Sequence, residues 1–260
     1  MLRHQIFECQ TKKTDKYVVL LHGFGGNHRV WKYQIPILQK QCNVLAIDLP
    51  SHNDNNLLLT QIDNSIKSVT QKIITVLDEY NIKNAVFIGV SLGTIFIKQL
   101  EISFPEYIDY AIMVGAVCEV GTFLTAVVNV FSKIGDKLPF TFVYRVFSKV
   151  LMPSKDSKES RKIFCKCAEA LNRHEFKAWM NIFKENFSLS RRYKNKTNPR
   201  NLYIAGVSDL CFLKGIKSEA KNTNGRFVLF KNCGHVCNID QRERFNKLLL
   251  LEINKGVVTV

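Results

Sequence analysis

No stretch of this sequence has the composition of a signal peptide or of an uninterrupted membrane-spanning segment. Residues 1–13 lack the apolar run that a signal peptide requires. Residues 110–131 approach spanning length, but Glu119 and two glycines, Gly115 and Gly121, interrupt them. We therefore expect a soluble, cytoplasmic protein without stable membrane insertion.

The eight cysteines lack the spacing of a disulfide framework or of a zinc site. Cys233 and Cys237 flank His235, but no C-x-x-C pair elsewhere in the chain completes a metal site. A chain of 260 residues also buries a large enough core to fold without disulfide bonds. We expect reduced thiols and no bound metal.

Acidic residues are scarce, because 22 Asp and Glu stand against 37 Lys and Arg, which gives a formal net charge of +15. Such an excess can attract nucleic acid, anionic lipid or an acidic protein. The basic residues are scattered, however, and no compact basic block with interleaved aromatic residues is present. The sequence therefore indicates no nucleic-acid partner.

Apolar runs of strand length alternate with segments of helical periodicity. Most of the runs are uninterrupted, which is typical of strands covered on both faces in a parallel sheet. Strands are predicted at 3–10, 17–21, 44–48, 85–90, 108–116, 202–205 and 227–230, and helices at 28–40, 61–80, 92–103 and 241–254. This alternation predicts an α/β fold with a mostly parallel, doubly wound sheet.

Residues 117–196 break this alternation. Helices are predicted there at 122–134, 140–151, 157–171 and 174–187, with no strand among them. A helical block between two strands of an α/β sheet is most simply an insertion above one edge. We therefore divide the chain into a core formed by 1–116 and 197–260 and a helical cap formed by 117–196.

A candidate nucleophile lies in the sequence Gly89-Val90-Ser91-Leu92-Gly93, which has the pattern G-x-S-x-G. This segment connects a predicted buried strand to a predicted helix. A serine at such a sharp turn has a strained backbone and an exposed hydroxyl, and the flanking glycines leave room for the turn. The pattern predicts that Ser91 is a nucleophile and that the Leu92 amide points to the same position.

A serine hydroxyl needs a general base, and the base needs an acid that orients it. His235 and Asp209 each follow a predicted strand at its carboxyl end, where open α/β sheets gather their sites. We expect them to be the base and the acid, and Glu119, just after the strand at 108–116, is the alternative acid. Surface or loop positions are expected for the histidines that lack this placement, which are His4, His28, His52 and His174.

Acyl transfer also needs donors for a developing oxyanion. Leu92 N–H is one candidate. The second is Phe24 N–H in the sequence His22-Gly23-Phe24-Gly25-Gly26, where the glycines let the backbone approach a substrate. We expect His22 to brace this loop rather than transfer a proton.

Together, His22-Gly23-Phe24, the G-x-S-x-G segment, Asp209 and Gly234-His235 resemble the α/β-hydrolase superfamily, in its small capped esterase branch. The resemblance extends from residue 17 to about 250. It implies an α/β-hydrolase fold of about eight strands with a helical cap, no metal and no organic cofactor. Relatives commonly have D-x-x-G-x-G where this chain has Asp48-Leu-Pro-Ser-His-Asn53, and the lost glycines change a loop beside the site.

We expect a serine hydrolase that cleaves a small or medium apolar carboxylic ester or thioester through an acyl-enzyme intermediate. Residues 117–196 contain 16 Lys and Arg against 7 Asp and Glu, a surface that would suit an acidic acyl carrier protein. Two alternatives remain open. The same triad would serve a lyase or an acyltransferase, or the scaffold would bind a ligand with only vestigial activity.

Overall fold

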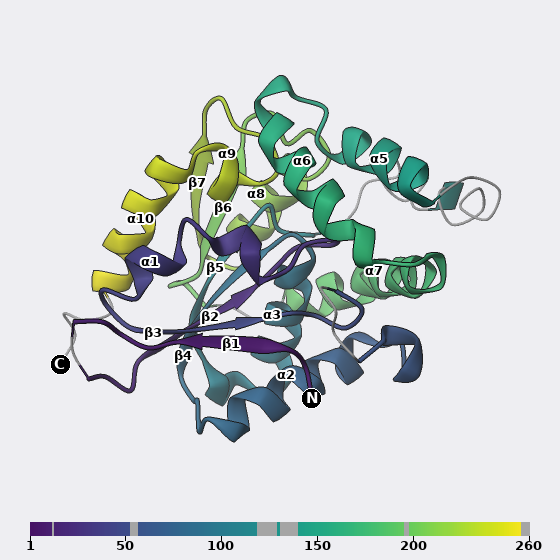
Figure 1. Ribbon diagram of the computed structural model, residues 1–260. Helices are drawn as coiled ribbons and strands as arrows, with labels where there is room; N and C mark the ends of the chain where they lie inside the picture. The colour runs from purple at the N-terminus through teal and green to yellow at the C-terminus, as the bar shows by residue number, and fades with distance from the viewer. Residues whose placement is uncertain (12, 53–56, 119–128, 131–139, 195–197, 256–260) are drawn as a thin grey trace.

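A seven-stranded sheet forms the centre of the computed structural model, which describes residues 1–11, 13–52, 57–118, 129–130, 140–194 and 198–255 (Figure 1). The strand order is β1-β3-β2-β4-β5-β6-β7. β1 is antiparallel to β3, and all other neighbours are parallel. The strands are β1 His4–Phe7, β2 Tyr17–Leu21, β3 Asn43–Ile47, β4 Ala85–Val90, β5 Ile108–Val114, β6 Leu202–Gly206 and β7 Arg226–Phe230. The predicted α/β fold with a mostly parallel sheet is confirmed, with seven strands in the described residues rather than about eight.

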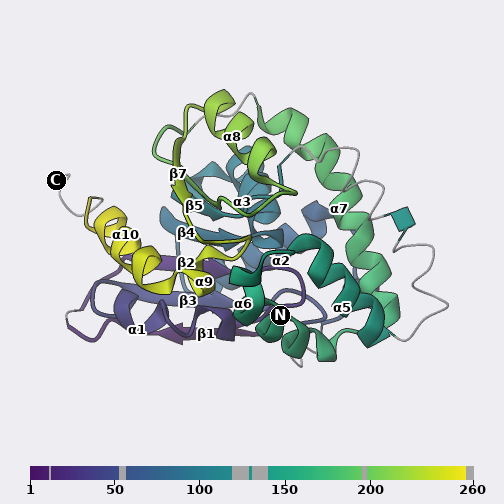
Figure 2. The same ribbon diagram turned by 90° about the horizontal axis from the view of Figure 1, so that it is seen from above.

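Both faces of the sheet are covered by helices. Successive side chains of β2 belong to two separate apolar clusters, with Val19 and Leu21 in one and Val18 and Leu20 in the other. The first cluster includes residues of α2 (Ile66–Glu79), α3 (Leu92–Ser103) and α8 (Leu213–Asn222). The second includes residues of α1 (Ile35–Leu38) and α10 (Arg242–Lys255), on the other side of the sheet (Figure 2). Burial on both faces explains why the strand sequences are uninterrupted apolar runs.

The predicted helix at 28–40 is wrong in its extent. A short 3-10 helix, His28–Trp31, comes first, and α1 begins only at Ile35. Pro36 lies in the first turn of α1, the part of a helix where a missing backbone N–H costs nothing. The next helix, α2, begins at Ile66 rather than 61, because the Ser65 hydroxyl accepts the Ser68 N–H at 3.1 Å and caps it.

Between β5 and β6 the described residues form helices and no strand. They are α5 (Phe140–Leu151), α6 (Lys158–Cys167) and α7 (Arg173–Tyr193), with short 3-10 helices at Lys155–Ser157 and Ala168–Ala170. Most of the predicted helix at 122–134 lies outside the described residues. α7 packs against α3, which follows β4, and α6 packs against α9 (Cys237–Asp240), which follows β7. This segment therefore lies over the edge of the sheet at which β4 and β7 end (Figures 1 and 2). The domain boundaries at 117 and 196 stay a prediction.

None of the helices within the described ranges has the length and apolarity needed to cross a membrane.

Candidate active site

Ser91 lies at the junction of β4 and α3, in a backbone conformation that L-amino acids rarely adopt. Its φ and ψ are 49° and −113°. Its N–H donates to the Val114 carbonyl oxygen of the neighbouring strand β5 at 2.9 Å, and its own carbonyl oxygen accepts the Thr94 hydroxyl at 2.6 Å. Surrounding hydrogen bonds therefore hold a strained turn, which is the local structure that the G-x-S-x-G pattern predicts.

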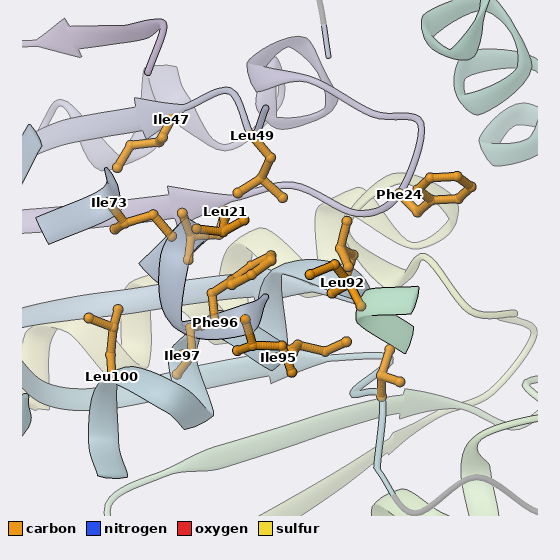
Figure 3. Close-up of a cluster of buried hydrophobic side chains, with 14 of the residues drawn as sticks. Leu21, Phe24, Ile47, Leu49, Ile73, Leu92, Ile95, Phe96, Ile97 and Leu100 are labelled. Atoms are coloured by element: carbon orange, nitrogen blue, oxygen red, sulfur yellow. The ribbon is translucent and has the colours of Figure 1, made fainter. Parts of the chain in front are cut away.

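Close packing of α3 on β2 explains why a glycine stands two residues after Ser91. A Cβ at Gly93 would lie 2.4 Å from the Leu21 carbonyl oxygen, which no larger residue would tolerate. Gly89 lies within β4 and is paired with Leu21 of β2. Figure 3 shows Leu21 and Leu92 packed with the α3 side chains Ile95 and Phe96. The first turn of α3, and with it Ser91, therefore has one position relative to the sheet.

The structure brings His235 and Asp209 together. His235 Nδ1 lies 2.8 Å from Asp209 Oδ2, and both side chains are buried. Because a carboxylate oxygen accepts, Nδ1 carries the proton and Nε2 of the neutral ring is left as an acceptor. That Nε2 is buried and has no hydrogen-bond partner in the described part of the chain.

Two further contacts hold the imidazole of His235 in place. The Phe212 ring stacks on it at 4.6 Å between centroids. Gly115, just after β5, approaches it so closely that a Cβ there would lie 2.9 Å from ring atoms. The alternative acid, Glu119, lies outside the described residues.

The loop after β2 approaches Ser91 directly. A Cβ at Gly23 would lie 3.4 Å from the Ser91 Cβ. The Gly23 carbonyl oxygen accepts from His22 Nδ1 at 2.8 Å and from the Gly26 N–H at 2.9 Å. In the same peptide unit, the Phe24 N–H has no acceptor among the residues described. One end of this peptide is thus held, while the other end is free to bind an oxyanion.

The Leu92 N–H belongs to the first residue of α3 and has no partner inside the helix. Both proposed oxyanion donors therefore belong to backbone next to Ser91. Figure 3 shows Phe24 at the end of the loop after β2 and Leu92 at the start of α3.

Ser91 and His235 open onto one cavity, whose volume is about 40 Å³. This space has room for a few water molecules, and its lining is mostly aromatic and aliphatic. Its apolar lining consists of Phe24, Tyr144, Phe147, Leu151, Met152, Phe164, Phe183, Phe212 and Val236. α5 supplies three of these nine residues, and Met152 directly follows that helix. α6 supplies Phe164 and α7 supplies Phe183.

Two of the histidines expected at surface or loop positions are buried. The prediction is wrong for His28, which lies in the 3-10 helix His28–Trp31, whereas His52 lies in the turn after β3. His28 Nδ1 lies 2.9 Å from Asp48 Oδ2. His52 Nε2 accepts the Gly25 N–H at 2.9 Å, and its Nδ1 donates to the Pro50 carbonyl oxygen at 2.8 Å. A carboxylate for His28, and backbone groups for His52, take the place of water. His4, in β1, is half-buried, and His174, in α7, is exposed as expected.

Burial lowers the pKa of two histidines, His22 in the loop after β2 and His52 beside it. The pKa of His52 falls to about 3, first because the ring is desolvated and then because His22 lies beside it. Desolvation also lowers the pKa of His22. The Nε2 of His22 accepts the Leu49 N–H at 2.9 Å, so both rings act as neutral braces, with one nitrogen donating and the other accepting.

Sequence reasoning missed the side chains that α5 and α6 bring to the site, chiefly Tyr144 and Phe164. Each is an apolar position of an amphipathic helix, a pattern that predicts burial but gives no partner. The thiols beside His235, those of Cys233 and Cys237, both donate to the Gly234 carbonyl oxygen. Within the described ranges, no three His, Cys, Asp or Glu side chains gather in a way that suits a metal ion.

A sequence profile described as "Alpha/beta hydrolase family" matches residues 18–248, which is most of the chain. The chain belongs to the alpha/beta hydrolase family. This membership agrees with the sheet order and with the strained serine between β4 and α3, and it confirms the family resemblance of the sequence.

Solved alpha/beta hydrolases have the same fold. An esterase (EaEST) from Exiguobacterium antarcticum superposes with a TM-score of 0.79 at 15% identity, covering 97% of this chain and 95% of that one. The enol-lactonase from Burkholderia xenovorans LB400 gives a TM-score of 0.81 at 16% identity, covering 97% and 96%. At these identities the likeness concerns the fold alone.

One curated relative is the pimeloyl-[acyl-carrier protein] methyl ester esterase of Aeromonas hydrophila. It is 31% identical over 99 residues, which are 38% of this chain and 37% of the relative. Across five curated relatives, which differ in their activities, the chain spans only 16% to 41% of the relative's length. These comparisons establish the family of the chain, and the similarity to the individual relatives covers only part of their length.

Proposed function

We propose that this hydrolase cleaves a carboxylic ester or thioester through an acyl-enzyme intermediate, with Ser91 as nucleophile, His235 as general base and Asp209 as the orienting acid. One observation carries the proposal. A serine in a strained strand-to-helix turn opens onto the same cavity as a histidine whose Nδ1 is bonded to a carboxylate and whose Nε2 has no partner among the residues described. This arrangement suits nucleophilic catalysis by a hydroxyl.

The proposed reaction has two half-reactions. Ser91 Oγ attacks the carbonyl carbon while its proton moves to His235 Nε2, and the carbonyl electron pair becomes an oxyanion that the Phe24 and Leu92 N–H groups bind. The oxyanion then collapses and expels the alcohol or thiol, which takes the proton from His235. Water attacks the acyl-enzyme in the same way, releasing the acid and returning the proton to Ser91.

Covalent labelling with a fluorophosphonate tests the nucleophile. Wild-type protein should form one adduct on Ser91 and hydrolyse short p-nitrophenyl esters, and Ser91→Ala should do neither. Ser148→Ala is the matched control, because Ser148 also lines the cavity but donates its hydroxyl to the Arg145 carbonyl oxygen at 2.8 Å. Labelling that persists in Ser91→Ala, or that disappears in Ser148→Ala, would exclude Ser91 as the nucleophile.

Product analysis separates the alternatives. A hydrolase releases the free acid and the alcohol or thiol in equal amounts. An acyltransferase would need an added alcohol for turnover, and a lyase would form no acyl-enzyme. A binding protein would hold one ligand tightly while the wild type remained unlabelled.

An acidic acyl carrier protein is the proposed carrier of the acyl group. The supporting observations are the excess of basic residues in 117–196, which we propose as the cap, and the similarity to an esterase that acts on an acyl-carrier substrate. Lys158, Lys162 and Lys166 are all exposed and lie four residues apart, so they form one basic stripe along α6. α6 also supplies Phe164 to the cavity, which places this stripe beside the site.

Reversing the charge of the stripe tests this partner. Replacing the three α6 lysines by Glu should lower kcat/KM for an acyl-carrier thioester about tenfold at low salt, and leave a free p-nitrophenyl ester unaffected. The control makes the same change at three exposed lysines of α8, Lys214, Lys217 and Lys221. Equal losses in both triple variants, or a loss that salt does not reduce, would contradict docking on α6.

A further inference from the structure

One peptide unit beside the proposed oxyanion donor is held at both of its polar ends by side chains. The Phe24 carbonyl oxygen accepts the Tyr144 hydroxyl at 3.1 Å. The Gly25 N–H of the same peptide unit donates to His52 Nε2 at 2.9 Å. Tyr144 belongs to α5 and His52 to the turn after β3, so three separate segments meet at this peptide.

The orientation of this peptide constrains the backbone around the Phe24 N–H. The peptide between Phe24 and Gly25 meets the preceding peptide, which contains the Phe24 N–H, at the Phe24 Cα, and the φ and ψ angles of Phe24 set how the two are oriented to each other. A flip of the held peptide would exchange its oxygen and its N–H, and would break both hydrogen bonds at once. The two side chains therefore stabilise one orientation of the backbone that presents the donor to Ser91.

Gly25 is suited to this arrangement. Its φ is +71°, in the left-handed region. A Cβ at this position would lie 1.9 Å from the Tyr144 hydroxyl oxygen. The absence of a side chain on Gly25 thus allows Tyr144 to reach the neighbouring carbonyl.

His52 is a fixed acceptor. Its Nδ1 must donate to the Pro50 carbonyl oxygen, which leaves Nε2 of the neutral ring to accept from Gly25. The ring lies against Trp179 of α7 at 5.2 Å and against His22 at 4.8 Å between centroids. Burial lowers the pKa of His52 to about 3, so the ring stays neutral over the range in which most hydrolases work.

The Phe24 side chain extends the same connection. Its ring is surrounded by aromatic rings of α5 and α7, with centroids 5.6 to 6.5 Å away, namely Tyr144, Phe147, Phe176, Trp179 and Phe183. Phe24 thus joins the two parts of the fold, since its backbone lies beside Ser91 and its ring packs among the helices that follow β5.

We propose that Tyr144 and His52 are positioning residues of the oxyanion hole, and that Tyr144 makes the donor geometry depend on the seating of α5 against the core. This inference rests on the proposed serine hydrolase function. In the correctly seated state the Phe24 N–H faces the reacting carbonyl oxygen. When the Tyr144 hydroxyl is lost, the peptide becomes free to turn and the donor is misplaced for part of the time.

Affinity for an inhibitor that forms an oxyanion distinguishes a positioning role of Tyr144 and His52 from a role in packing alone. The variants are Tyr144→Phe, which removes one hydroxyl, His52→Leu, which removes the acceptor, and His52→Gln, whose Oε1 replaces Nε2 as acceptor. Tyr33→Phe is the matched control, because the Tyr33 hydroxyl also joins the core to α6, through Glu159 at 3.1 Å, without touching the loop after β2. Each variant is assayed for kcat and KM on p-nitrophenyl acetate. Each is also assayed for its affinity toward a trifluoromethyl ketone, which forms an oxyanion adduct on serine, and toward the corresponding methyl ketone.

Tyr144→Phe and His52→Leu should each lower kcat about tenfold with little change in KM. They should weaken the trifluoromethyl ketone by a similar factor and leave the methyl ketone unchanged, because only the oxyanion uses the donor. His52→Gln should recover most of the loss, and Tyr33→Phe should behave as wild type.

Equal weakening of both ketones in Tyr144→Phe would overturn the proposal, since it would indicate lost packing in the cavity. So would unchanged binding of the trifluoromethyl ketone, or a His52→Gln variant no better than His52→Leu. Failure of the wild type to label at Ser91 would refute the proposed function and the positioning role together. A fully active wild type with unaffected variants would refute the positioning role alone.

Discussion

Lys98 and Glu219 form an ion pair between α3 and α8 inside the protein. Lys98 Nζ lies 2.8 Å from Glu219 Oε2, and the two side chains are 0% and 5% exposed. The ammonium also donates to the Val117 carbonyl oxygen at 2.8 Å, at the point where the chain leaves β5. A buried pair of this kind links α3, which begins directly after Ser91, to α8, which follows Asp209.

The loss of one partner should be far more harmful than the loss of both. Lys98→Met leaves a buried carboxylate without a cation and should lower the free energy of unfolding by about 3–5 kcal/mol. The double variant Lys98→Met, Glu219→Leu should be more stable than either single variant, because no uncompensated charge remains. Urea unfolding of the four proteins measures the coupling, and additive losses in the double variant would contradict it.

Asp209→Asn should separate the two candidate acids. An Asn amide donates where the carboxylate accepts, which favours the wrong tautomer of His235, and kcat should fall by about a thousandfold or more with the fold retained. Glu119→Gln should leave kcat within about twofold, as should Asp156→Asn at an exposed position of the Lys155–Ser157 turn. A larger loss in Glu119→Gln than in Asp209→Asn would make Glu119 the orienting acid.

The sequence was sufficient to predict the strands and the residues that gather at their ends. Uninterrupted apolar runs identify strands buried on both faces. Ser91 directly follows one of them, and Asp209 and His235 lie in the loops after two others. These positions depend on local pattern and on the rule that parallel strands end at one edge. The triad roles that we assign to these three residues, and the oxyanion roles of the Phe24 and Leu92 N–H groups, stay proposals.

The side chains that shape the site were beyond prediction because their partners are remote in sequence. Tyr144 reaches the Phe24 carbonyl oxygen across 120 residues, yet by sequence it is one more aromatic on an amphipathic helix. His52 lies in an Asn-rich loop that predicts exposure, but it is buried because backbone groups satisfy both ring nitrogens. Pattern predicts burial, whereas these contacts depend on how segments meet in three dimensions.

Stability should fall in mild acid because of His52. Its pKa is about 3 in the folded protein and near the ordinary 6.5 once unfolded, so between these values only the unfolded chain binds the proton. The free energy of unfolding should therefore decrease as the pH falls from about 6.5 towards 3, with a slope of about 1.4 kcal/mol per pH unit for this one group. His22, whose pKa is also lowered, adds in the same direction.

Urea unfolding at several pH values measures this slope. His52→Gln should reduce it by about one proton relative to wild type, whereas His174→Gln, at an exposed position of α7, should leave it unchanged. The half-buried carboxyls of Glu101 and Asp240 have pKa values raised by desolvation and act in the opposite direction, so the difference between variant and wild type is the decisive quantity. An identical slope in His52→Gln would show that His52 does not titrate as described.

The size of the cavity should limit the acyl chain. With about 40 Å³ beside Ser91, the wild type should hydrolyse p-nitrophenyl acetate and butyrate much faster than the octanoate. Met152 lines this space, and Met152→Ala removes three heavy atoms from the side chain. The ratio of kcat/KM for octanoate over acetate should therefore rise roughly tenfold.

Met180→Ala is the control, because Met180 is also buried, in α7, but does not line the cavity. Both variants should lose about 2–5 kcal/mol of stability, and only the first should change the chain-length preference. The same shift in both would mean that general loosening, rather than the shape of this cavity, sets the preference.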